Sequence, residues 1–195
     1  MTTRRDFLKT MTMASAGLAL GTGDLLGAPI SVSQRKAAAD KVKIAYVGIG
    51  NRGEQIIGDF ARTGMVEVVA LCDVDMGAPH TQKVMNMYPK AKRFRDFRQM
   101  FDKAGNDFAA VAIATPDRSH FPITMLALAS GKHVYVEKPL ARTFYEAELL
   151  MQAALKRPNL VTQVGNQGHS EANYFQFKAW MDAGIIKDVT AVTAH

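Results

Sequence analysis

Short apolar runs alternate with helix-like segments from residue 42 to residue 165. The expected strands are residues 42–50, 66–74, 93–94, 109–115, 133–136 and 160–165. The segments between them, residues 53–63, 78–88, 97–103, 119–131 and 143–158, have the apolar spacing or the start and stop residues of helices. Such alternation requires right-handed crossovers and produces a parallel sheet with helices on both faces. We therefore predict an α/β fold, a doubly wound parallel sheet, with a ligand at the carboxyl ends of its strands.

A glycine-rich turn follows the first expected strand and opens the first expected helix. It fits the pattern G-x-G-x-x-G and consists of Gly48, Ile49, Gly50, Asn51, Arg52 and Gly53. In this context the first glycine permits a tight turn, the second lets a pyrophosphate approach, and the third lets helix and strand pack closely. The free N–H groups at the start of the helix would then face the phosphates. The alternative is a glycine turn without a ligand.

An aspartate at the end of the second expected strand completes this pattern. Asp73 lies 20 residues after Gly53, where its carboxylate can accept hydrogen bonds from the ribose hydroxyls of an adenosine. The same carboxylate would repel a 2′-phosphate, so NAD is favoured as the cofactor over NADP. Asp75 is a rival for this role, although it lies further from the end of the strand.

The fifth expected strand ends in Glu137, Lys138 and Pro139. In a doubly wound domain this position opens onto the nicotinamide side of the cleft, where Lys138 could exchange protons with a substrate hydroxyl. Glu137 could orient Lys138 or bind the ribose of the cofactor, and a cis peptide bond before Pro139 would suit so tight a turn. From these three residues alone, a strand-end ion pair with a turn proline is the better interpretation.

Four motifs in this order resemble the Gfo/Idh/MocA family of sugar and cyclitol oxidoreductases: GIGNRG, CDVD, TPDRSH and EKPLA, each after an expected strand. The resemblance extends over about residues 42–195. It implies an NAD(P)-binding Rossmann domain followed by an α/β domain with an open sheet, and hydride transfer to or from a sugar or related polyol. It also implies that Lys138 is the active-site lysine, and that Thr115, Pro116 and His120 border the cofactor. His120 could equally be a helix-start residue without a chemical role.

The segment after the sixth expected strand is polar and contains Asn166, Gln167 and His169. The resemblance implies that this crossover lines the substrate pocket; a polar turn between domains is the alternative. A helix is expected at residues 173–183, with its aromatic side chains in a core, and residues 185–195 are expected to form the first strand of a second domain.

The expected domain plan has three parts. Residues 1–41 form an export leader and linker, residues 42–166 the dinucleotide-binding domain, and residues 167–195 the incomplete start of a substrate and oligomerisation domain. The resemblance implies substantially longer proteins, and we expect a homo-oligomer for the full-length form. Two other functions stay open: a glycoside-cleaving enzyme that oxidises its substrate transiently and recycles NAD, and a nucleotide-binding module without catalysis.

The N-terminus has the layout of an export signal. Arg4 and Arg5 precede Phe7-Leu8-Lys9, and residues 11–21 form a short apolar run. The start resembles a twin-arginine signal, and the apolar run is too short to span a bilayer, so we expect periplasmic export without stable membrane insertion. A disordered basic N-terminus on a cytoplasmic protein is the alternative.

Charge and cysteine content argue against two other classes of function. The formal net charge is +6, but residues 1–41 contribute +3 through six basic and three acidic residues, and the remaining chain has no arginine-rich run. Nucleic-acid binding is therefore not expected. Cys72 is the only cysteine, which excludes an internal disulfide and a cysteine-based metal site, and no metal is expected.

Overall fold

The computed structural model describes residues 41–193, and the predicted export leader therefore lies outside the described residues. Within this range six parallel strands form one sheet in the order β3-β2-β1-β4-β5-β6. The strands are β1 (Val42–Val47), β2 (Val66–Cys72), β3 (Lys92–Phe94), β4 (Ala110–Ile113), β5 (His133–Val136) and β6 (Thr162–Val164). This order is that of a Rossmann sheet, and it confirms the predicted doubly wound fold.

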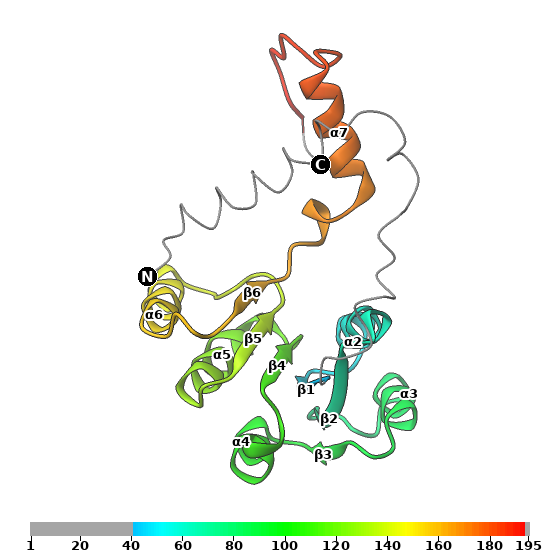
Figure 1. The fold of residues 1–195 in the computed structure, drawn as a ribbon, viewed down its shortest axis with the longest axis vertical. Coiled ribbons are helices and arrows are strands. Elements are labelled where there is room, and N and C mark those ends of the chain that lie inside the picture. Colours follow the sequence, from blue (N-terminus) through cyan, green and yellow to red (C-terminus); the bar gives the residue numbers. More distant parts are fainter. Residues whose placement is uncertain (1–40, 194–195) are drawn as a thin grey trace, which may run out of the picture. The chain divides into compact units, whose positions relative to one another are not determined.

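Helices cover both faces of the sheet. They are α2 (Arg52–Thr63), α3 (Pro79–Met87), α4 (Phe97–Ala104), α5 (His120–Ala129) and α6 (Phe144–Leu155). A further helix, α7 (Ala172–Asp182), has no buried residue and does not cover the sheet. Short 3₁₀ segments η2 (Gly105–Asp107), η3 (Asp117–Ser119) and η4 (Gln167–His169) connect some of them. Helices α2 and α3 lie on one face, and α4, α5 and α6 lie on the other (Figure 1). None of the helices between residues 41 and 193 has both the length and the apolar character to cross a membrane.

The apolar character of the strands follows from this double covering. Along β1, Ile44 and Tyr46 pack under α2 and α3, whereas Ala45 and Val47 pack under α4 and α5. Successive side chains of a strand point to opposite faces, so a strand covered on both faces needs apolar residues at every position. This burial produces two cores, one on each side of the sheet.

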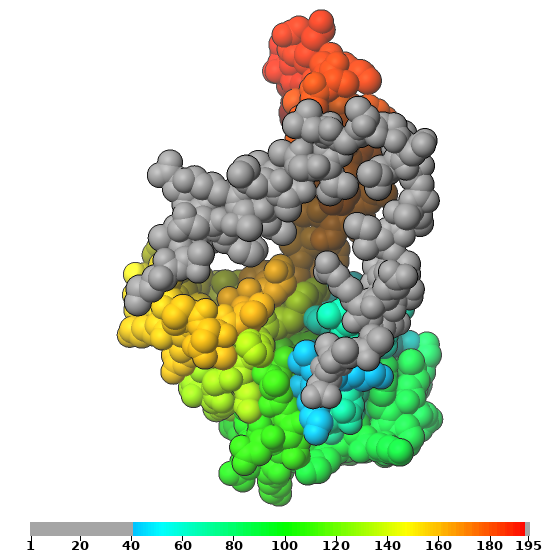
Figure 2. Space-filling model, viewed as in Figure 1, coloured from blue at the N-terminus to red at the C-terminus, as the bar shows by residue number. Residues whose placement is uncertain are grey.

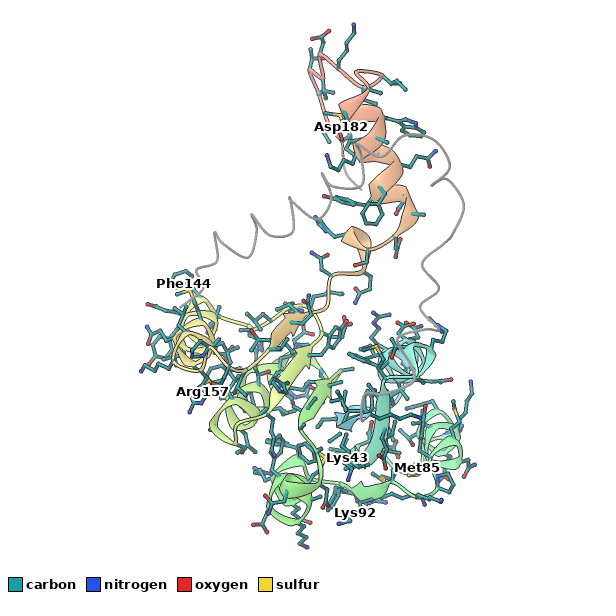
Figure 3. The ribbon with its side chains drawn as sticks, viewed as in Figure 1. Lys43, Met85, Lys92, Phe144, Arg157 and Asp182 are labelled. Atoms are coloured by element: carbon teal, nitrogen blue, oxygen red, sulfur yellow. The ribbon has the colours of Figure 1, made fainter. Side chains whose placement is uncertain are left out.

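Local signals set the start of α6. The Thr143 hydroxyl accepts a hydrogen bond from the Glu146 N–H at 3.1 Å, which is one half of a capping box. The Glu146 carboxylate accepts in return from the Arg142 N–H at 2.9 Å rather than from that of Thr143. The outer face of α6 lies at the surface (Figure 2, yellow), where Phe144 is exposed at the first turn (Figure 3).

Residues 166–193 differ from the sequence-based expectation in two respects. Helix α7 forms where it was predicted, and Gly184 ends it with a φ of +68°, but none of its residues is buried. Its aromatic side chains, including Phe175 and Trp180, are exposed and do not form the expected core. Residues 185–193 do not form the predicted strand, because a strand needs a paired neighbour and no described strand lies beside them. The division of the chain into three parts remains a prediction.

Candidate functional site

The site lies where the strand order reverses, between β1 and β4 (Figure 1). The Gly48 N–H donates to the Cys72 carbonyl at 2.8 Å, and the Ala114 N–H donates to the Val47 carbonyl at 2.8 Å. The backbone at the end of β1 is therefore held by hydrogen bonds to the ends of both β2 and β4. Gly48 has a φ of +80°, and a Cβ there would lie 2.5 Å from the Ala114 carbonyl oxygen. Both the conformation and the close approach therefore require glycine at this position.

The glycine loop has the features of an anion site. A Cβ at Gly53 would clash with the Gly48 carbonyl oxygen, so this glycine lets α2 pack onto the loop as predicted. Asn51 precedes α2 with a φ of 46°, and its side chain does not cap the helix. Within residues 41–193 no group accepts the backbone N–H of Gly50, Asn51 or Arg52. These donors at a helix N-terminus suit a phosphate group.

A histidine that the sequence did not single out lies against this loop. A Cβ at Gly50 would clash with the imidazole ring of His80, which comes from the first turn of α3. The missing side chain of Gly50 thus makes room for His80 as well as for a ligand. His80 belongs to no motif, and only its position early in the helix after Asp73 could have drawn attention to it.

Asp73 is tied to the glycine loop. Its Oδ2 accepts a hydrogen bond from the Ile49 N–H at 2.9 Å, and its Oδ1 accepts from the Asp75 N–H at 3.0 Å. The Asp75 carboxylate instead accepts from the N–H groups of Gly77 and Ala78 and so shapes the turn before α3. Of the two rival carboxylates, Asp73 is thus the one held beside the glycine loop.

A cavity of about 610 Å³ runs along the glycine loop and Asp73. Pro116 also lines it, as do four basic residues that the sequence analysis missed: His80, Arg95, Arg98 and Arg118. Arg95 and Arg98 lie close together after β3, whereas His80 and Arg118 come from two other segments, so only the fold brings the three segments together. Cys72 contributes to the wall as a neutral group, because burial, followed by the charges of Asp73 and Asp96, raises the pKa of its thiol to about 12.

A second cavity, of about 350 Å³, adjoins the first and shares Arg52, Ala114 and Thr115 with it. Lys138 lies in its wall and is exposed, and the Lys138–Pro139 peptide bond is cis, as expected from the sequence. His120, Glu137 and Gln167 complete the lining. The two cavities together form one trough along the carboxyl ends of β1, β4 and β5.

Glu137 is the most heavily bonded side chain in this trough. Its Oε1 accepts hydrogen bonds from the Arg52 guanidinium at 3.1 and 3.2 Å, from the Tyr135 hydroxyl at 3.1 Å and from the Gln167 amide at 2.7 Å. Burial pushes the pKa of Glu137 upward, but the bonds from Gln167, Arg52 and Tyr135 and the charge of Arg52 outweigh it. The pKa therefore lies below its ordinary value, and Glu137 is a carboxylate at neutral pH.

His120 joins two parts of the site. The residue is buried at the start of α5, with Nε2 2.8 Å from the Thr115 carbonyl oxygen and Nδ1 2.6 Å from the Pro139 carbonyl oxygen. It thereby braces the turn after β5 against the end of β4. The Thr115 hydroxyl oxygen is buried and has no hydrogen-bond partner within the described residues, although Thr115 lines both cavities. An orphaned polar atom in such a wall indicates a ligand that would satisfy it.

Only one of the three predicted substrate residues lines the trough. Gln167 lines the second cavity, whereas Asn166 and His169 line neither cavity. The His169 Nδ1 lies 3.2 Å from the Asn166 Oδ1, and the His169 ring lies 4.9 Å from that of Tyr174. Between residues 41 and 193 no three His, Cys, Asp or Glu side chains gather closely enough to hold a metal ion.

A family model and several known proteins match this chain in sequence or in fold. The family model for Gfo/Idh/MocA proteins, described as an oxidoreductase family with an NAD-binding Rossmann fold, matches residues 42–165. An inositol 2-dehydrogenase of Salmonella typhimurium is 31% identical over 147 residues, which cover 74% of this chain and 43% of that relative. A glycosyl hydrolase family 109 protein of Shewanella pealeana is 30% identical over 167 residues, which cover 77% of this chain and 36% of that relative.

The fold of the chain also matches a solved structure. The scyllo-inositol dehydrogenase from Lactobacillus casei, with bound cofactor NAD(H) and scyllo-inositol, matches with a TM-score of 0.66 and 28% identity over 77% of this chain and 44% of that chain. The chain thus spans less than half of the length of the relatives that it matches. The NAD-binding Rossmann fold predicted from the sequence is confirmed.

Proposed function

The chain belongs to the Gfo/Idh/MocA oxidoreductase family, and from this premise we propose that the whole protein transfers a hydride between NAD and a sugar or related polyol. One observation carries the proposal. The trough formed by the two cavities has a glycine loop and Asp73 at one end and Lys138 at the other. An extended dinucleotide laid along it would bring its reactive ring to the lysine.

The residues present fit such a dinucleotide. The free N–H groups of Gly50, Asn51 and Arg52 would hold the pyrophosphate, and Asp73 would accept hydrogen bonds from the adenosine ribose. The orphaned Thr115 hydroxyl lies in the wall shared by both cavities and would gain a partner. Glu137 would bind the second ribose, at the far end of the trough.

Lys138 is proposed to accept and donate the proton that is transferred in the reaction. When bound, NAD supplies the hydride acceptor, and its reduced form the donor, so the protein must move only a proton. The Lys138 amine is exposed to the second cavity and would take the proton of a substrate hydroxyl during oxidation and return it during reduction. The relatives named for inositol support a cyclic polyol or sugar as the substrate class.

The test is to compare variants of a catalytically active form of the protein on a panel of sugars and polyols, following NADH by absorbance. Lys138→Ala is expected to lower kcat roughly 100-fold or more, the scale of a lost acid–base group. Lys138→Arg should also fail, because it keeps the charge without yielding a proton. Lys90→Ala, at an exposed turn after α3, is the matched control. An unchanged kcat in folded Lys138→Ala would remove Lys138 from the mechanism.

A second candidate is a glycoside-cleaving enzyme that oxidises its substrate transiently and restores NAD. The similarity to a glycosyl hydrolase family 109 protein supports this candidate. Free NADH accumulates during net oxidation but not during a cycle that returns the hydride. Release of an aglycone without accumulation of NADH would therefore select this second candidate.

We also propose that the protein is exported through Arg4 and Arg5 and that its full-length form is a homo-oligomer. The leader pattern in the sequence supports export. Export through these two arginines would be contradicted if exchange of both for lysine left the distribution of the protein between periplasm and cytoplasm unchanged. Light scattering of the full-length protein tests the second proposal, which a monomer would contradict.

A further inference from the structure

A single carboxylate oxygen joins three segments of the chain that are far apart in sequence. Arg52 from the start of α2, Tyr135 from β5 and Gln167 from the crossover after β6 all donate to Oε1 of Glu137. The side chain of Glu137 is only 5% exposed, and no described residue donates to its Oε2. Oε2 is thus the oxygen that Glu137 can offer to the cavity that it lines.

Gly165 lies close to the same oxygen. It is buried, and its N–H donates to the Val136 carbonyl at 2.8 Å, which holds the crossover beside the end of β5. A Cβ at Gly165 would lie 2.6 Å from Glu137 Oε1 and 2.7 Å from the Tyr135 hydroxyl. Its φ lies outside the left-handed region, so the backbone does not require glycine. Only the close approach of the Glu137 and Tyr135 side chains requires it.

We propose that Gly165 and Gln167 are positioning residues for the cofactor, which hold Oε1 of Glu137 so that Oε2 meets a ribose hydroxyl of the nicotinamide half. This inference rests on the proposed function, because it takes the second cavity as the nicotinamide end of the trough. It changes the role expected for Gln167, whose amide N–H₂ is directed to Glu137 at 2.7 Å. The crossover thus belongs to the cofactor site rather than to the substrate pocket alone.

Gly165→Ala tests this role without removing any hydrogen-bonding group. The added methyl group would meet side-chain atoms of Glu137 and Tyr135 rather than backbone atoms, so the fold should survive while Glu137 moves. Calorimetry on the whole chain is expected to show NAD binding roughly tenfold weaker, the scale of a lost hydrogen bond to a charged group. AMP, which fills only the Asp73 end of the trough, should bind within twofold of wild type.

Gly168→Ala is the matched control. Gly168 lies in the same crossover, has no atom within 4 Å of an added Cβ and should leave both affinities within twofold. Unchanged NAD binding by folded Gly165→Ala would overturn the proposal. A parallel loss of AMP binding would do the same, because it would show general damage to the domain.

A double-mutant cycle distinguishes an effect of Gln167 that acts through Glu137 from a direct contact between Gln167 and NAD. The cycle also tests the proposal if Gly165→Ala does not fold. Gln167→Met, which keeps the length but loses the donor, should weaken NAD binding severalfold in wild type and by less than twofold in a Glu137→Ala background. Gln167→Lys, which restores a donor to the carboxylate, should recover most of the affinity. Additive effects would overturn the positioning role alone, whereas wild type that bound no NAD would overturn the proposed function itself.

Discussion

If the proposed function holds, Asp73 determines whether the trough binds NAD or NADP. Its carboxylate is held at the glycine loop by the Ile49 N–H, where a 2′-phosphate would meet a fixed negative charge. Asp73→Ser is expected to weaken NAD binding roughly tenfold and to narrow the preference for NAD over NADP, because the repulsion is removed. Titration of both cofactors measures this. Asp75→Asn, which loses a charge bound to the turn before α3, should leave the preference unchanged. Equal binding of NAD and NADP to wild type would contradict the assignment.

Glu137 gives the domain a pH-dependent stability. Burial raises its pKa, but hydrogen bonds from Gln167, Arg52 and Tyr135 and the charge of Arg52 lower it further, so the folded pKa lies below the ordinary 4.5. The ionised form therefore stabilises the fold above about pH 4.5, and this stabilisation is lost as the pH falls through the lower folded pKa. Wild type should have a higher Tm than Glu137→Gln at pH 7, and the difference should shrink in acid. A difference as large at pH 3 as at pH 7 would contradict this; Glu148→Gln, exposed on α6, is the control.

At single positions the sequence analysis selected candidate site residues that belong to ordered motifs, and their roles stay predictions. Gly48, Asp73 and Lys138 lie just beyond the ends of β1, β2 and β5, and the end of a strand fixes where the next residues lie. Gly53 lies in the first turn of α2, the helix that follows β1. His80 was missed because it is carried to the loop by the packing of α3, which no local pattern encodes. Gln167 was placed in the right segment, but its bond to Glu137 depends on a pairing between β5 and β6 that only the fold defines.

The contact between α2 and the glycine loop depends on one missing methyl group. At Gly53 an added Cβ would clash with the Gly48 carbonyl oxygen, a backbone atom that cannot move without the loop. Gly53→Ala is expected to lower the free energy of unfolding by about 1–3 kcal/mol and to abolish measurable NAD binding. Gly58→Ala in the same helix meets only the end of Arg62, at 3.9 Å, and should be neutral or stabilising by up to about 1 kcal/mol. Denaturant unfolding of both variants measures the contrast, and equal stability of the two would contradict it.

The strands and helices of residues 42–165 were predictable, whereas the burial of α7 and the conformation of residues 185–193 were not. The alternation from β1 to β6 specifies the doubly wound sheet because the inner strands β2, β1, β4 and β5 are buried by helices that lie between strands in the sequence. Residues 185–193 have a strand-like composition, but no strand within the described part of the chain pairs with them. The same reasoning applies to α7, whose helical pattern is correct while none of its side chains is buried.

For the molecule as a whole, we predict that this chain binds NAD but does not turn over a substrate. The residues proposed to contact the cofactor all lie between Gly48 and Lys138 and line the two cavities of the trough, and Gly165 and Gln167 are proposed to position Glu137 among them. Of the residues expected to contact substrate, Gln167 is bonded to Glu137, and His169 lies beside Asn166 and Tyr174.

Catalysis needs a substrate held with its reacting atoms about 3–3.5 Å apart, and of the described residues only Lys138 is proposed to act on the substrate. The test combines calorimetry with NAD and an absorbance assay for NADH on a sugar and polyol panel, with Gly53→Ala as the non-binding control. Binding without NADH formation is the expected result. Robust turnover by this chain would show that its own residues hold the substrate, and Asn166 and His169 would then be the first side chains to replace.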